Sequence, residues 1–133
     1  MKIALFMDFI RLRIGSQLFD RIKPYNDAID YIGPEKMTKL RVLKPAADWA
    51  RYPFGIDFNL AGWIHDGLYE IGGDESFRQW VDGIFQEAME WLIAHYTSAV
   101  SIVQRFLARI RAKEYYKMVR LAGSTCFNYR EAQ

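Results

Sequence analysis

The chain has 133 residues, of which 51% are hydrophobic and 16% are aromatic. A chain of this length is most simply one domain, residues 1–133, and it holds enough apolar residues to fill a core without disulfide bonds. The formal net charge of +2 is too small to indicate a nucleic-acid-binding protein. The only cysteine, Cys126, cannot pair within the chain, which favours a reducing compartment over secretion.

Apolar residues recur at helical spacing through residues 3–22 and predict an amphipathic helix. The apolar run that begins at Ile3 is interrupted by Asp8 and followed by Arg11 and Arg13. It is therefore too short for the core of a signal peptide or for a membrane span. We expect this helix to pack against the domain, with a position on a membrane surface as the alternative.

Residues 33–53 contain three of the four prolines and are expected to form loop with a helical turn or a short strand. Asp57 is a suitable N-cap for a helix of about 14 residues, because its carboxylate can accept from the first free amides. Gly72 and Gly73 then supply a permissive stop. A central helix that contains His65, Asp66 and Tyr69 is predicted.

A second helix is predicted from a cap at Asp74 to beyond Leu92, with Asp82 among its apolar residues. The turn between the two helices is only a few residues long, so the helices should pack side by side and antiparallel. This arrangement would bring Asp82 to His65. A buried carboxylate needs a donor or a positive partner, so the pair is either catalytic or a hydrogen bond that ties two helices together.

A third long helix is predicted over residues 99–121. Its expected apolar stripe consists of Ile102, Val103, Phe106, Leu107 and Ile110. The same segment is the most basic in the chain, with Glu114 as its one acid among Arg105, Arg109, Arg111, Lys113, Lys117 and Arg120. This basic segment is either a solvated helix face or a surface attracted to anionic phospholipid headgroups. Nucleic acid binding is less favoured, because the aromatic residues here do not form a stacking platform.

The two central helices carry a motif that resembles the core of phospholipase A2 domains, particularly the short bacterial and plant types. It consists of Phe58-x-x-Ala61-x-x-x-His65-Asp66-x-x-Tyr69, then Gly72-Gly73, then Asp82-x-x-Phe85-x-x-x-Met89. The run from Pro53 to Phe58 is similar to the segment that enters this helix in bacterial members. The chain has Gly62 and Leu68 where the family usually carries disulfide cysteines, and it lacks the glycine-rich calcium loop of the animal enzymes.

The resemblance implies a role for each matching residue. His65 would be the general base, Asp82 would orient it, and Tyr69 would support their network. Asp66 would bind Ca²⁺, and approximate alignment puts a second calcium ligand at Asp48. The His-Asp-x-x-Tyr motif, Asp82 and the segment 115–123 are also similar to a phage-encoded domain family of unknown function.

The sequence thus predicts a small all-α domain built on an antiparallel helix pair, with amphipathic helices at both ends. The resemblance implies calcium-dependent hydrolysis of a phospholipid acyl ester, with a phospholipid or anionic membrane surface as partner. The alternative is a non-catalytic structural or interaction protein of a phage or bacterium that retains the scaffold. The expected location is cytoplasmic or phage-associated, at the periphery of a membrane, with no signal peptide and no transmembrane helix.

Overall fold

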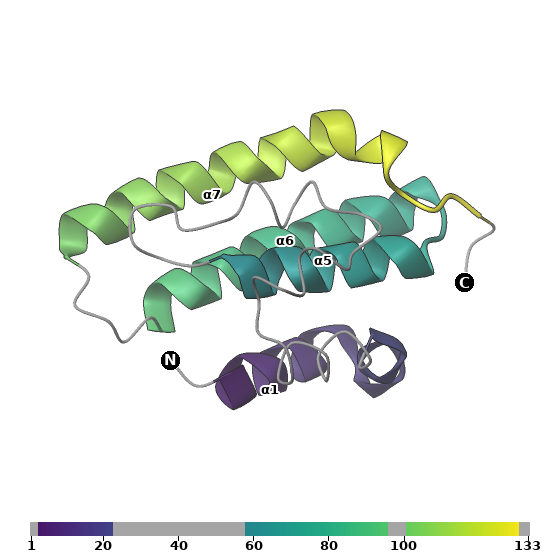
Figure 1. Cartoon of the computed structure of the whole chain (residues 1–133), viewed down its shortest axis with the longest axis horizontal. Coiled ribbons are helices and arrows are strands. Elements are labelled where there is room, and N and C mark those ends of the chain that lie inside the picture. Colours follow the sequence, from purple (N-terminus) through teal and green to yellow (C-terminus); the bar gives the residue numbers. More distant parts are fainter. Residues whose placement is uncertain (1–2, 23–57, 96–100, 131–133) are drawn as a thin grey trace.

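The computed structural model describes residues 3–22, 58–95 and 101–130 (Figure 1). The elements with defined bounds are α1 (Ile3–Ile14), α5 (Asn59–Ile71), α6 (Glu75–His95), α7 (Ile102–Ala122) and a 3-10 helix, η2 (Gly123–Thr125). The described residues form no strand, only an isolated bridge between Gly73 and Tyr129. The all-α prediction is confirmed. Phe58 occupies the N-cap position of α5 and its side chain makes no capping hydrogen bond, so the predicted cap at Asp57 is wrong. The predictions for Asp48 and residues 33–53 lie outside the described residues.

Helix α6 is the element that the other helices share, because it contacts α5, α7 and α1. In Figure 1, α5 and α6 run side by side through the middle, α7 lies along one side of them, and α1 lies along the other. Every residue from Leu60 to Tyr69 in α5 is buried. A helix enclosed on all sides holds its polar side chains away from water, so each of them needs a partner inside the protein.

The N-terminal segment packs on α6, but it is not one continuous helix as the periodicity predicts. Helix α1 ends at Ile14, Gly15 takes a positive φ of 89°, and residues 16–22 are helical again. Phe6 is fully buried and meets the ring of Trp91 edge-on, with 5.7 Å between the centroids. This contact supports packing against the domain.

The predicted apolar stripe of the last helix is wrong. Its expected members Ile102, Val103, Phe106 and Ile110 are exposed, and Leu107 is only half-buried. The buried residues of α7 are instead Ala108, Ala112 and Val119. Small side chains let two helix backbones approach closely, which explains how alanines rather than larger residues form the contact with α6.

Two helix starts are fixed by side chains that accept from free backbone amides. The amide of Phe77 donates to Asp74 Oδ1 at 2.9 Å, which confirms Asp74 as the cap of α6. At the start of α7, Ser101 and Gln104 form a reciprocal capping box, with each side chain bonded to the backbone amide of the other.

The C-terminal segment closes over the turn that joins α5 to α6. The Gly73 amide donates to the Asn128 carbonyl at 3.1 Å, and the backbone amide of Arg130 donates to the Gly73 carbonyl at 2.9 Å. Phe127 is buried edge-on against Tyr69, with 5.0 Å between the ring centroids. The chain end therefore holds the turn, and through it the relative position of the two central helices.

Gly72→Ala is expected to lower the free energy of unfolding by about 1–3 kcal/mol. Gly72 has a φ of 73°, and an added Cβ would collide with the Asn128 carbonyl oxygen. Gly83→Ala is the matched control, because a Cβ there meets nothing within 4 Å and alanine favours the interior of α6. Urea denaturation of both variants checks the contrast. Equal stability of the two variants would show that the C-terminal segment does not hold the turn.

Candidate functional site

His65 and Asp82 face each other across the two central helices. His65 Nε2 lies 2.7 Å from Asp82 Oδ1, as the sequence predicts, and the residues are only 3% and 0% exposed. A carboxylate only accepts hydrogen bonds, so Nε2 carries the proton and donates it. The neutral ring therefore has its free lone pair on Nδ1.

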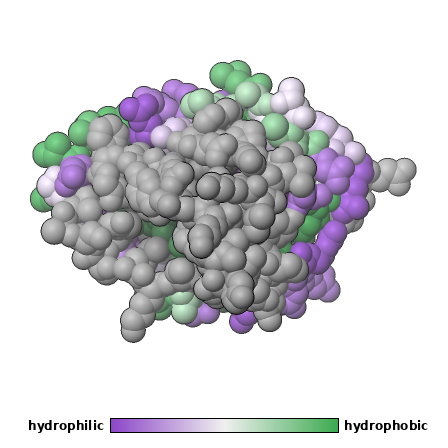
Figure 2. Space-filling model, viewed as in Figure 1, coloured by the Kyte–Doolittle hydropathy of each residue, from purple (hydrophilic) through white to green (hydrophobic). Residues whose placement is uncertain are grey.

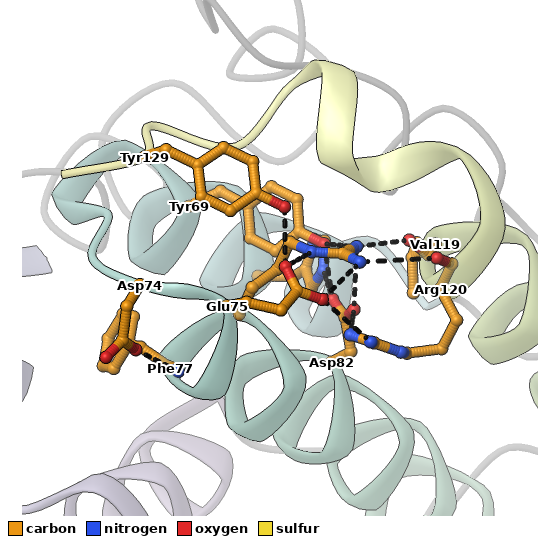
Figure 3. A network of polar contacts seen from close by, with 10 residues as sticks. Tyr69, Asp74, Glu75, Phe77, Asp82, Val119, Arg120 and Tyr129 are labelled. Atoms are coloured by element: carbon orange, nitrogen blue, oxygen red, sulfur yellow. Dashed lines mark hydrogen bonds and ion pairs between the residues drawn. The ribbon is translucent and has the colours of Figure 1, made fainter. Parts of the chain in front are cut away.

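Asp82 accepts hydrogen bonds from side chains on all three packed helices. Besides His65, Tyr69 donates its hydroxyl to Oδ1 at 2.6 Å, and Arg120 donates Nη1 to Oδ2 at 2.7 Å. Arg78 also reaches Oδ2 with Nη1, at 3.5 Å. Figure 3 shows Tyr69 and Arg120 converging on Asp82. The buried carboxylate is thus both hydrogen-bonded and neutralised by positive charge.

The two arginines share a second carboxylate, Glu75. Arg78 binds it with two bonds of 2.8 Å, and Arg120 donates Nη2 to it at 3.1 Å. Tyr129 adds its hydroxyl at 2.6 Å (Figure 3). Since two acids face two arginines, the charges in this network balance.

Arg78 also connects the network to the end of α7. Its Nη1 donates to the Val119 carbonyl at 3.1 Å, and its Nη2 lies 3.5 Å from the Arg120 carbonyl. The Val119 carbonyl also accepts from the Gly123 amide, so the buried guanidinium adds a second donor at the end of α7, where carbonyls have few partners within the helix. Arg78 consequently links α6 to α7 as well as supporting Asp82.

Sequence reasoning missed Glu75, Arg78 and Arg120. A local signal existed for the first two, because Arg78 follows Glu75 by three positions and precedes Asp82 by four, which puts all three on one face of a helix. No local pattern points from Arg120 to Asp82, since these residues are 38 positions apart. That pairing follows only from the packing of α7 on α6.

The ionisation of the buried pair is set by its partners. Burial lowers the pKa of His65, but the negative charges of Asp66 and Asp82 and the hydrogen bond with Asp82 outweigh it, so the pKa is raised above 6.5. Burial raises the pKa of Asp82, yet bonds and charge from His65, Tyr69 and Arg120 lower it overall. Asp82 is thus a stable anion beside a histidine that holds its proton more strongly than usual.

The other ring nitrogen of His65 stands apart from this network. His65 Nδ1 is buried and has no hydrogen-bond partner among the described residues. Asp66 Oδ1 is 3.8 Å from it, which is beyond a hydrogen bond but close enough for electrostatic attraction. The rings of Tyr69 and Phe85 lie beside the imidazole, at 4.0 and 4.8 Å between centroids. One side of the ring is anchored, and the other presents a free lone pair.

The predicted calcium ligands are only partly placed. Asp66 is 4% exposed and offers a carboxylate next to His65, whereas Asp48 lies outside the described residues. Within residues 3–22, 58–95 and 101–130, no group of three or more His, Cys, Asp or Glu residues could hold a metal ion. Carboxylate oxygen suits calcium, which takes about six to eight oxygen ligands, so Asp66 is a suitable ligand but does not make a calcium site by itself.

Comparisons of this chain with protein-family models, with curated protein sequences and with solved structures gave no significant match.

Proposed function

We propose that this chain hydrolyses a phospholipid acyl ester, with His65 as the general base. One observation carries the proposal: Nε2 of His65 is held by Asp82 at 2.7 Å, while its buried Nδ1 has no hydrogen-bond partner in the described part of the chain. Buried polar atoms are normally satisfied, so an unsatisfied nitrogen beside an anchored one points to a group that acts on a ligand.

The proposed reaction uses water as the nucleophile. Nδ1 of His65 takes a proton from a water molecule as the water oxygen forms a bond to the ester carbonyl carbon. The imidazolium that results is stabilised by Asp82, which remains an anion because of its arginine and tyrosine donors. Collapse of the tetrahedral intermediate breaks the bond to the alcohol oxygen, and Nδ1 returns the proton to that leaving group. No covalent enzyme intermediate is required.

In this proposal Asp66 is one ligand of the calcium ion. Asp48, which lies outside the described residues, is proposed as a second oxygen ligand. Bound calcium would polarise the ester carbonyl and stabilise the negative charge that develops on its oxygen. The carboxylate of Asp66 is near the working nitrogen of His65, which suits a site where the carbonyl and the attacking water must meet.

A second candidate function is a non-catalytic scaffold, as in a phage or bacterial structural protein. The contacts of Arg78 favour this scaffold function. Arg78 contacts Asp82, Glu75 and the end of α7, and it therefore joins α6 to α7, which the His65–Asp82 pair does not do. A network of this kind holds helices together without any reaction. The two functions differ in what Asp66 and Nδ1 of His65 contribute.

Asp66→Asn is expected to abolish calcium binding and acyl release together, because the substitution removes the charge that holds a hard cation and retains the size of the side chain. Isothermal titration calorimetry with calcium and an acyl-release assay on mixed phospholipid vesicles measure the two losses. Thermal unfolding without calcium is the control for folding. A scaffold predicts no calcium binding by either protein, and that result would contradict the enzyme proposal.

The raised pKa of His65 gives opposite pH dependences for stability and for hydrolysis. Protonated His65 is stabilised by Asp66 and Asp82 in the folded chain. Its contribution to the free energy of unfolding is complete below the unfolded pKa of about 6.5 and is lost as pH rises through the higher folded pKa. Catalysis needs the neutral ring, so acyl release should rise over the same range. Denaturation and initial rates measured in one buffer series check both slopes, and a rate that falls instead would exclude His65 as the base.

A further inference from the structure

Helix α7 exposes large apolar side chains on the side that faces away from α6. Ile102 is 86% exposed, Val103 65%, Phe106 60% and Ile110 43%. Near the other end of the helix, Leu121 is 85% exposed. We name these five residues, together with the basic residues Arg109, Lys113 and Lys117, the α7 outer face. Figure 2 shows green apolar surface beside purple hydrophilic surface along the edge where α7 runs.

The outer face follows one line along the helix. Positions 103, 106, 110, 113, 117 and 121 are three or four residues apart and therefore share a side of the helix. The buried residues Ala108, Ala112 and Val119 lie on the opposite side and hold α7 to α6. A helix of this length is about 30 Å long. The outer face is thus a continuous ridge along α7, which lies along one side of α5 and α6 (Figure 1).

The charge on this ridge is positive. Arg109, Lys113 and Lys117 are exposed and follow one another at intervals of four. Two other basic residues of α7 bind groups within the protein. Arg120 binds Asp82 and Glu75, and Arg105 donates a hydrogen bond to the Ile93 carbonyl. The one acid of α7, Glu114, is paired with Arg111 at 3.0 Å. Arg105 is therefore left out of the α7 outer face, and Lys117 is included.

We infer that the α7 outer face docks on an anionic lipid bilayer. Apolar side chains on a convex helix can enter the boundary between headgroups and acyl chains, while Arg109, Lys113 and Lys117 extend their charged ends to lipid phosphates and carboxylates. A second copy of the chain fits less well, because it would bring the same positive residues to the contact. A protein partner would need a matching apolar groove lined with acids. No helix in the described ranges is long and apolar enough to cross a bilayer.

Flotation of the whole chain with vesicles tests this inference without any need for hydrolysis. The wild type is expected to float with phosphatidylserine–phosphatidylcholine vesicles and to bind pure phosphatidylcholine far less. Arg109→Glu, Lys113→Glu and Lys117→Glu together should weaken binding to the anionic vesicles by at least about a hundredfold, since each cation contributes about fivefold. High salt should weaken the wild type in the same direction.

A separate variant tests the apolar contribution. Phe106→Ser is expected to reduce vesicle binding about tenfold, whereas Leu12→Ser, at a site that is 87% exposed on α1, should leave it unchanged. Circular dichroism confirms that each variant folds. Equal binding by the charge-reversed triple variant would overturn the inference. Sedimentation that shows a wild-type dimer and a monomeric Phe106→Ser variant would overturn it too, and would assign the ridge to self-association. Loss of vesicle binding with unchanged hydrolysis of a dispersed short-chain ester would separate docking from catalysis.

Discussion

His65→Asn is expected to reduce acyl release by about 10²–10⁴-fold, to the background rate, while calcium binding persists. Asparagine is similar in size and can still donate a hydrogen bond to Asp82, but it has no basic nitrogen where Nδ1 stands. The free energy of unfolding should fall by about 1–3 kcal/mol, because the contact with Asp82 is replaced only in part. Initial rates on mixed phospholipid vesicles and calcium calorimetry measure the two properties separately.

The second histidine of the chain supplies the control for this experiment. His95 is exposed on α6, where it stacks on Trp91 with 4.1 Å between ring centroids and contacts the Trp91 carbonyl. His95→Asn should therefore retain the wild-type rate. A His65→Asn protein that folds and keeps that rate would show that the buried histidine is structural.

Asp82→Ala is expected to have the largest effect on stability, lowering the free energy of unfolding by about 3–5 kcal/mol. The change would leave two arginines, a histidine and a tyrosine without the acceptor that they share in a buried setting. A typical domain is stable by about 5–15 kcal/mol, so such a loss removes a large part of the total. Urea denaturation gives the value, and Asp82→Asn, which retains an oxygen acceptor, should lie between alanine and wild type.

The surface pair of Arg13 and Glu87 provides the comparison for that variant. Both side chains are well exposed, at 38% and 44%, and an exposed ion pair contributes about 0–1 kcal/mol. Glu87→Ala should therefore change stability little. If Asp82→Ala and Glu87→Ala were equally mild, the buried network would not be what holds α5, α6 and α7 together.

The parts of the site that lie on the two central helices were predictable from the sequence. Asp74 is a cap with a side-chain acceptor, Gly72 has a backbone that favours glycine, and the short turn between the helices forces His65 and Asp82 together. Each of these features depends on neighbours in the chain. Local periodicity and turn chemistry are enough to specify them.

The parts that depend on the third helix were not predictable in this way. The large apolar residues of α7 suggested a buried face, but small residues such as Ala108 and Ala112 make the contact with α6. Hydrophobicity alone ranks alanine below isoleucine and phenylalanine, although close packing of helix backbones favours small side chains. For the same reason the contact between Arg120 and Asp82 was not predicted, since it depends on which side of α7 faces the core.

Acyl release by the unmodified chain, with calcium present and with calcium chelated, tests the central claim most directly. Mixed phospholipid vesicles serve as substrate, and mass spectrometry of the extracted lipids identifies the products. The proposed reaction of water at His65 predicts equal amounts of free fatty acid and lysophospholipid, formed only when calcium is present. A folded wild-type chain that binds no calcium and releases no fatty acid would contradict the assignment as a phospholipid hydrolase.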